Sequence, residues 1–128
     1  MPNRENANQY ARVAKLAYQL IVKNKLTAKE AWNKAAEEEI DNLSSRVKIC
    51  PRETFIGLCD SGKLKNISKK EISKSRNYDY AVYAISVWEK DEFILKNDLW
   101  KKVYSHFGFA KNHQGQLDVL EGLWEYLK

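Results

Sequence analysis

The amino-acid sequence predicts an all-α protein, a compact bundle of six to seven helices that forms a single domain over residues 1–128. Apolar residues recur at spacings of three and four along most of the chain, and residues typical of helix starts precede these segments. Only five glycines and two prolines are present, fewer than strands joined by tight turns need. We expect two helical hairpins on either side of a central helix, with residues 1–5 frayed.

An internal sequence similarity supports the prediction of two hairpins. Tyr-Ala stands at 10–11 and again at 80–81, and each copy leads to a tryptophan, in AWNKA and in LWKKV. Coincidence between two amphipathic hairpins is the alternative explanation of this similarity, so two similar hairpins are predicted and a repeat architecture is not.

The charge of the chain is moderately basic, with a formal net charge of +5. Such a balance permits an anionic partner but does not require one. The polar first nine residues are unlike a secretory signal, and no apolar run reaches the roughly 18 residues of a membrane span. Two cysteines without a disulfide framework suit a reducing compartment. We therefore predict a cytoplasmic protein with no membrane partner.

The first hairpin is predicted over residues 6–24 and from residue 28 to about residue 43. The tetrapeptide TAKE at 27–30 spells a capping box, in which Thr27 and Glu30 satisfy each other's backbone N–H groups at the start of the second helix. The connection between the two helices is short, so they should pack antiparallel.

The segment ICPRETFIGLC, residues 49–59, predicts the central helix. Pro51 suits a first turn, where a missing backbone N–H costs nothing. The helix should end near Asp60, with Gly62 in the left-handed conformation that stops helices.

The second half of the chain predicts four further helical segments. SKKE at 68–71 is another capping-box spelling and predicts a short turn over residues 68–73. A longer helix should start at Asn77 or Asp79, another at Asn97 and Asp98, and the last over residues 114–127, with one apolar face.

Cys50 and Cys59 are the first candidates for chemistry. Zinc sites favour cysteines two to four residues apart, whereas eight residues separate these two and one helix would turn them to different sides. We predict no metal and no cofactor. Cys50, near a helix start and beside Arg52, has the surroundings of an activated thiolate, but no base stands at a recognisable spacing. Buried thiols that behave as small hydrophobic groups are the favoured alternative.

Arg52 is an anion-binding candidate. It lies in the first turn of the predicted helix, where the helix dipole disfavours a cation, so a bound phosphate or carboxylate would give it a purpose. An ion pair with Glu53 or with an acid of another helix is the alternative.

The segment HQGQLD at 113–118 is a candidate polar cluster, composed of His113, Gln116 and Asp118. Asp118 can hold one tautomer of His113 and make it a general base. No nucleophile or oxyanion motif accompanies them, and helix capping explains the same letters. An enzyme would need His113, Arg52 and Cys50 around one pocket, so we predict no catalytic residue.

Residues 61–80 form a basic segment, in which six cations oppose only Glu71 and Asp79. A helix, a glycine turn and a short basic helix would resemble a helix-turn-helix, and a solvated lysine-rich loop is the alternative. The candidate nucleic-acid-binding residues are Lys63, Lys65, Lys69, Lys70, Lys74 and Arg76.

Four tryptophans and seven tyrosines are typical of surfaces for base stacking or protein contact, although most of these rings fall on the inner faces of the predicted helices. The best candidates for exposed rings are Tyr18, Tyr78, Tyr83 and Tyr126. The sequence thus predicts a non-catalytic binding module, with nucleic acid as the first candidate partner and a protein partner or a second copy of the chain as the alternative.

The motifs CPRETFIGLC, YAVYA and HQGQLDVLEGLW, together with AWNKAA at 31–36, resemble those of a family of small, uncharacterised bacterial helical proteins. The resemblance spans Tyr10 to Trp124 and implies one helical domain. It implies no activity, and no role is transferred to any residue. Its most specific motif falls on Cys50, Pro51, Arg52, Phe55, Gly57, Leu58 and Cys59.

Overall fold

The computed structural model describes residues 8–71, 74–109 and 115–128, and within these ranges it confirms the all-α class. The expected fraying of residues 1–5 lies outside the described residues. No strand occurs in the described ranges, only an isolated antiparallel bridge between Leu64 and Leu127. The elements are α1 (Gln9–Asn24), α2 (Ala28–Glu39), α3 (Leu43–Arg46), α4 (Ile49–Asp60), α5 (Arg76–Lys90), α6 (Lys96–Phe107), α7 (Gln116–Leu123) and the 3-10 turn η1 (Trp124–Tyr126).

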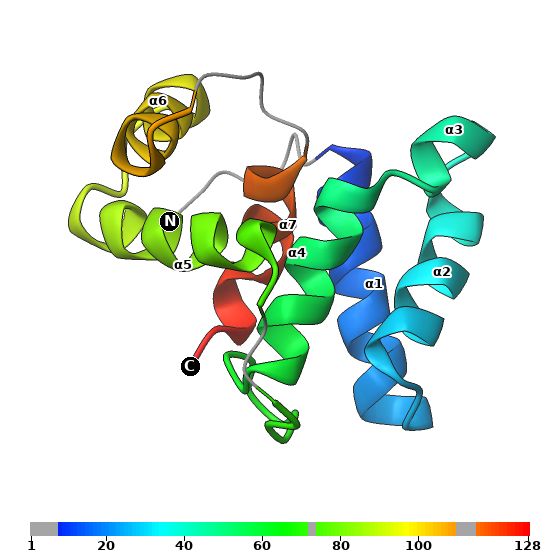
Figure 1. The fold of residues 1–128 in the computed structure, drawn as a ribbon. Helices are drawn as coiled ribbons and strands as arrows, with labels where there is room; N and C mark the ends of the chain where they lie inside the picture. Colours follow the sequence, from blue (N-terminus) through cyan, green and yellow to red (C-terminus); the bar gives the residue numbers. More distant parts are fainter. Residues whose placement is uncertain (1–7, 72–73, 110–114) are drawn as a thin grey trace.

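The two predicted hairpins flank the centre of the bundle. The α1–α2 hairpin lies on one side and the α5–α6 hairpin on the other, with α4 and α7 between them (Figure 1). The predicted central helix, α4, packs on α2, α5 and α7. The centre is shared, however, because α7 packs on α1, α4 and α5 and all eight of its residues are buried. The expectation of one apolar face for this last helix was therefore too narrow.

Helices α1 and α7 approach each other closely at Gly122. A Cβ atom placed there would collide with the carbonyl oxygen of Ala11 and lie 2.8 Å from its carbonyl carbon. The backbones of the two helices are therefore in contact, and only a glycine allows this spacing.

Two predicted helix ends are confirmed, those at Thr27 and Gly62, and two further ends, at Gly108 and Asn8, are also defined. Thr27 and Glu30 form the capping box of α2. Gly62 follows α4 with a φ of 75°, and Gly108 ends α6 with a φ of 77°. At α1, the Asn8 side chain accepts hydrogen bonds from the first backbone N–H groups.

The short helical turn predicted over residues 68–73 is wrong where the structure describes it, because residues 68–71 contain no helix. The backbone N–H groups of Lys70 and Glu71 instead donate to the carbonyl oxygen of Asp60, at 2.8 and 3.0 Å. Helix α5 also starts earlier than predicted, at Arg76, because Ser75 provides its cap by accepting from the Asn77 N–H.

The core is one continuous cluster of buried apolar side chains contributed by α1, α2, α4, α5, α6 and α7. Trp32 packs on Phe55 with ring centroids 5.4 Å apart, which joins α2 to α4. Tyr80 meets Trp100 edge to face at 6.0 Å, which joins α5 to α6. That the chain is one domain stays a prediction, which this continuity supports.

Candidate functional site

The first half of the basic segment is fixed to the core by its apolar residue. Leu64 is fully buried and forms the antiparallel bridge with Leu127. The N–H of Lys128 donates to the carbonyl oxygen of Lys63 at 3.0 Å, and the N–H of Lys65 donates to that of Tyr126 at 2.7 Å. Because side chains alternate along an extended backbone, Lys63 and Lys65 are exposed on either side of the buried Leu64.

Tyr18 adds a second attachment. Its hydroxyl donates to the carbonyl oxygen of Lys65 at 2.7 Å, and its ring stacks on Tyr126 at 4.0 Å between centroids. The prediction that Tyr18 and Tyr78 are exposed was wrong, because both are buried. Tyr83 and Tyr126 are half-buried. A tyrosine on an apolar helix face can bury its ring and still satisfy its hydroxyl through a backbone carbonyl.

The second half of the segment folds back against the end of α4. Gly62 allows this, since a Cβ atom there would lie 2.8 Å from the Cβ of Lys69. A hollow of about 280 Å³ is lined by residues of both this segment and the α1–α2 turn, among them Lys25, Asp60 and Lys70. The basic segment and the α1–α2 turn are therefore neighbours.

The surroundings of two acids near Lys70, Asp60 and Glu30, shift their pKa values in opposite directions. Burial raises the pKa of Asp60, and the charge of Lys70 opposes that rise. The hydrogen bonds from Thr27 lower the pKa of Glu30, with a smaller contribution from Lys70. Lys70 thus influences acids of both α2 and α4.

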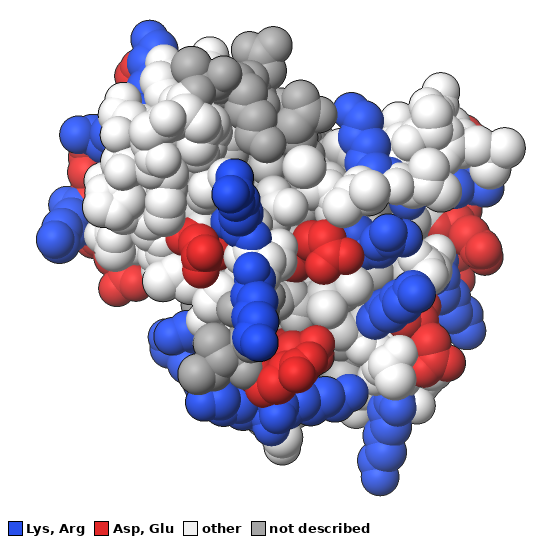
Figure 2. Space-filling model, in the orientation of Figure 1, with Lys and Arg blue, Asp and Glu red and all other residues white. Residues whose placement is uncertain are grey.

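The six cations of the segment are exposed, and the Nζ of Lys65 also donates to the carbonyl oxygen of Glu125 at 3.2 Å. None of them forms an ion pair with a residue of the described ranges. Figure 2 shows Lys and Arg side chains gathered along the lower edge of the molecule, where Figure 1 places the chain after α4 and the α1–α2 turn. The helix-turn-helix interpretation is wrong, because the described residues between α4 and α5 contain no helix.

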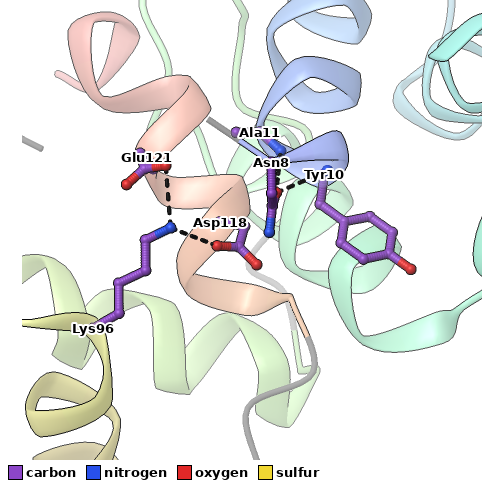
Figure 3. A network of polar contacts seen from close by, with 6 residues as sticks. All are labelled: Asn8, Tyr10, Ala11, Lys96, Asp118 and Glu121. Atoms are coloured by element: carbon purple, nitrogen blue, oxygen red, sulfur yellow. Dashed lines mark hydrogen bonds and ion pairs between the residues drawn. The ribbon is translucent and has the colours of Figure 1, made fainter. Parts of the chain in front are cut away.

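A buried polar network lies at the other end of α7. The Nζ of Lys96, in the first turn of α6, donates to Asp118 Oδ1 at 2.7 Å and to Glu121 Oε1 at 3.1 Å. The two carboxylates are three residues apart and share one face of α7, and their side chains are 9% and 6% exposed. Figure 3 shows Lys96 extending toward both, with the capping residue Asn8 of α1 beside Asp118.

The network fixes the protonation state of its lysine. Burial alone would lower the pKa of Lys96, but the hydrogen bonds and charges of Asp118 and then of Glu121 outweigh burial and raise it. An ammonium held by two carboxylates is a tie between α6 and α7, not a free base. Sequence reasoning found Asp118 but missed Lys96 and Glu121. The available signal was the pair of acids at i and i+3 in an otherwise apolar helix.

Gln116 joins a further helix to α7. It is fully buried, and its Nε2 donates to Asn77 Oδ1 on α5 at 3.0 Å. The two described members of the candidate polar cluster therefore do not form one site, because Gln116 contacts α5 and Asp118 contacts α6. The third member, His113, lies outside the described residues.

Arg52 is half-buried and forms no ion pair with any described residue, so the expected ion pair is not found there. Its neighbour Pro51 lies against the start of α7, 3.3 Å from the position that a Cβ of Gly115 would take. The amino ends of α4 and α7 therefore meet close to Arg52 in the chain. Anion binding by Arg52 stays a prediction.

The cysteines behave as small core residues to different degrees. Both are free thiols, Cys59 buried and Cys50 half-buried. Burial, and then the charge of Asp60, raises the pKa of Cys59, which makes it a poor nucleophile at neutral pH. Within the described ranges, no three His, Cys, Asp or Glu side chains are grouped as metal ligands.

The fold and these contacts define a small all-helical protein with polar ties at its centre and a basic segment fixed to its outside. No described helix is both long enough and apolar enough to cross a membrane. The chain belongs to DUF6979, a family of unknown function whose model matches residues 7–127. No curated protein matches the chain, and no solved structure does. The resemblance to an uncharacterised family is confirmed, whereas the bacterial origin and the cysteine-proline-arginine signature stay predictions.

Proposed function

We propose that this protein is a non-catalytic nucleic-acid-binding module that uses the basic segment of residues 63–76. One observation carries the proposal: six cations without an ion pair in the described ranges stand on a segment of which residues 63–65 are attached to the core through Leu64 and Tyr18. A flexible lysine-rich loop would lose both side-chain and backbone conformational entropy on binding. Residues 63–65 are already ordered by folding, so binding costs them little further backbone entropy.

The chemistry of the segment favours phosphate contacts over the recognition of base sequence. Lysine binds phosphate as a point charge, and contacts of this kind position a nucleic acid without reading its sequence. Between α4 and α5, the described part of the segment presents no helix for the major groove. We therefore expect binding with little sequence preference and a steep dependence on salt.

A fluorescence anisotropy titration with a labelled duplex, repeated over a salt series, tests the proposal. The wild type should bind at low salt, and the charge reversal Lys69→Glu/Lys70→Glu should weaken binding at least tenfold. The slope of log affinity against log salt should fall by about 0.9 for each lost phosphate contact.

A matched control carries the same change in net charge elsewhere. Lys34→Glu/Lys48→Glu alters exposed lysines in the middle of α2 and at the amino end of α4, whereas Lys69 and Lys70 lie at the carboxyl end of α4. The control should bind much more tightly than the Lys69/Lys70 variant. Equal losses in both variants, or no binding by the wild type at low salt, would reject the proposal.

A protein partner or a second copy of the chain is the second candidate function. Its support is a corner around α3, where Leu43, Val47 and Ile49 are 71%, 63% and 60% exposed. Contiguous exposed apolar residues are typical of contact surfaces. Light scattering over a concentration series tests it, since self-association through this corner should disappear in Leu43→Ser/Val47→Ser.

We propose a cytoplasmic location, which the two free cysteines support, and a bacterial origin, which the resemblance of the motifs implies. The anion-binding role proposed for Arg52 is separate from the basic segment. It is supported by the lack of an ion pair with any described residue.

A further inference from the structure

Three adjoining hollows follow the outer side of α5. The first, of about 250 Å³, lies between α5 and the chain end and is lined by Lys63, Val82, Ser86 and Lys128 among others. Val82 and Ser86 also line the second hollow, so the two hollows adjoin at these side chains.

The second hollow, of about 400 Å³, extends from Val82 and Ser86 to Tyr83 and Phe107. Tyr83 also lines the third hollow, of about 430 Å³, together with Lys101, Lys102, Ser105 and His106 of α6. The three shallow hollows thus adjoin through shared side chains, and together they are here named the α5 groove. It runs from Lys63 near the chain end to the carboxyl half of α6.

Lysines outnumber acids at both ends of the α5 groove. Lys63 and Lys128 stand at one end, and Lys101 and Lys102 at the other. The groove also contains two acids, Glu89 in the first hollow and Asp79 in the second. Glu89 lines the same hollow as Lys63 and Lys128, so phosphates are favoured most at Lys101 and Lys102 and are disfavoured beside the two acids.

The middle of the α5 groove offers aromatic rings. Tyr83 and His106 stack with ring centroids 4.0 Å apart and planes 14° from parallel. Phe107 is 40% exposed and meets Tyr83 edge to face at 5.9 Å. Partly exposed aromatic rings between cationic ends are the combination that single-stranded nucleic acids use, with bases on the rings and phosphates on the lysines.

We propose that the α5 groove binds single-stranded nucleic acid, with bases stacked on Tyr83, His106 and Phe107 and phosphates on the lysines of its two ends. This inference rests on the proposed function, and it names the form of nucleic acid and extends the binding surface from the basic segment, through Lys63, to α6. A duplex cannot use the rings in the same way, because its bases are already stacked and paired. The groove should therefore favour single strands over duplexes.

The test compares two labelled probes at low salt, an oligothymidylate of about 12 nucleotides and a duplex of equal length. Tyr83→Ala should weaken single-strand binding roughly tenfold, the range of one lost stacking contact, and change duplex binding less than twofold. Tyr83→Phe keeps an aromatic ring and should bind like the wild type. Thermal unfolding of each variant confirms that it is folded.

The exposed His106 provides a second variant that does not depend on the fold tolerating Tyr83→Ala. His106→Ala should also weaken single-strand binding selectively. Lys101→Glu/Lys102→Glu should lower the single-strand salt slope by about 0.7 per lost contact, whereas Lys34→Glu/Lys48→Glu should leave it nearly unchanged.

The outcomes separate this inference from the function on which it rests. If the wild type binds neither probe at low salt, the proposed function fails. If the wild type binds and the Lys69/Lys70 reversal weakens binding, but neither Tyr83→Ala nor His106→Ala affects single strands, only the α5 groove is rejected. Equal losses for both probes in those variants would also reject it, because stacking predicts a selective loss.

Discussion

Gly122 shows how a single residue sets the distance between two helices. Alanine is the better helix former, by about 1 kcal/mol, so a glycine inside α7 needs a reason. The reason is the backbone of Ala11, which occupies the space that a Cβ atom would need. Sequence periodicity cannot reveal such a contact, because it depends on how closely a helix more than a hundred residues away in the chain approaches.

Replacement of this residue, Gly122→Ala, should therefore destabilise the fold by about 3 kcal/mol, because overpacking against a backbone cannot be relieved by moving a side chain. Chemical denaturation measures the loss. Gly108→Ala is the control, since nothing lies within 4 Å of its added Cβ and only the cost of its positive φ remains, about 1 kcal/mol. Equal losses in the two variants would show that α1 and α7 are not in backbone contact.

Lys96 illustrates a partner that sequence reasoning missed. Asp118 stood out as a carboxylate in an apolar helix, but its lysine lies 22 positions away, a separation that no spacing rule covers. The folded protein satisfies the two buried carboxylates by bringing the start of α6 to α7, as Figure 3 shows.

The substitution Lys96→Met should cost about 2 kcal/mol near neutral pH, less than for a fully buried pair because Lys96 remains about a third exposed. The exposed Lys101→Met is the control and should cost little. Because folding raises the pKa of Lys96, its contribution is complete below the ordinary value of 10.5 and disappears as the pH rises through the folded value.

The difference in unfolding free energy between wild type and Lys96→Met should therefore be constant from neutral pH to about pH 10 and shrink at higher pH. Urea titrations over this range measure it. A difference that shrinks already between pH 6 and pH 9 would contradict the assignment to Lys96.

Two segments with the same capping-box pattern form different structures. TAKE at 27–30 and SKKE at 68–71 both read as capping boxes, yet only the first starts a helix in the described residues. The first is followed by Ala31, Trp32 and Ala35, which are buried against the core. The second is followed by mainly polar residues, and its backbone N–H groups are taken by Asp60. A cap starts a helix only where an apolar face follows it.

Alanine substitution at Thr27 and at Ser68 should therefore change the stability of the protein by different amounts. Thr27→Ala should cost about 1 kcal/mol, and Thr27→Ser should restore most of it. Ser68→Ala should change the stability by less than about 0.5 kcal/mol, as is usual for surface substitutions. Thermal or chemical denaturation decides the matter, and a loss at Ser68 as large as that at Thr27 would mean that residues 68–71 do form a capped turn.

For the molecule as a whole, the sequence predicted the overall fold well and the functional surface poorly. Helical periodicity and end signals were enough for the all-α class and for the two hairpins, because both follow from local patterns. The burial of α7 on all sides, the attachment of residues 63–65 to the chain end and the α5 groove follow from tertiary contacts. Of the candidate site, the lysines were identified from composition, but the way they are held was not.

We propose that residues 63–76 and the α5 groove form one surface for nucleic acid. Amide chemical shifts of the isotope-labelled protein, followed while a short oligothymidylate is added at low salt, test this proposal residue by residue. We predict saturable shifts that concentrate in residues 63–70, in the α1–α2 turn and along Val82, Tyr83 and Ser86. Shifts confined to the corner around α3, or no shifts at the lowest salt, would contradict it.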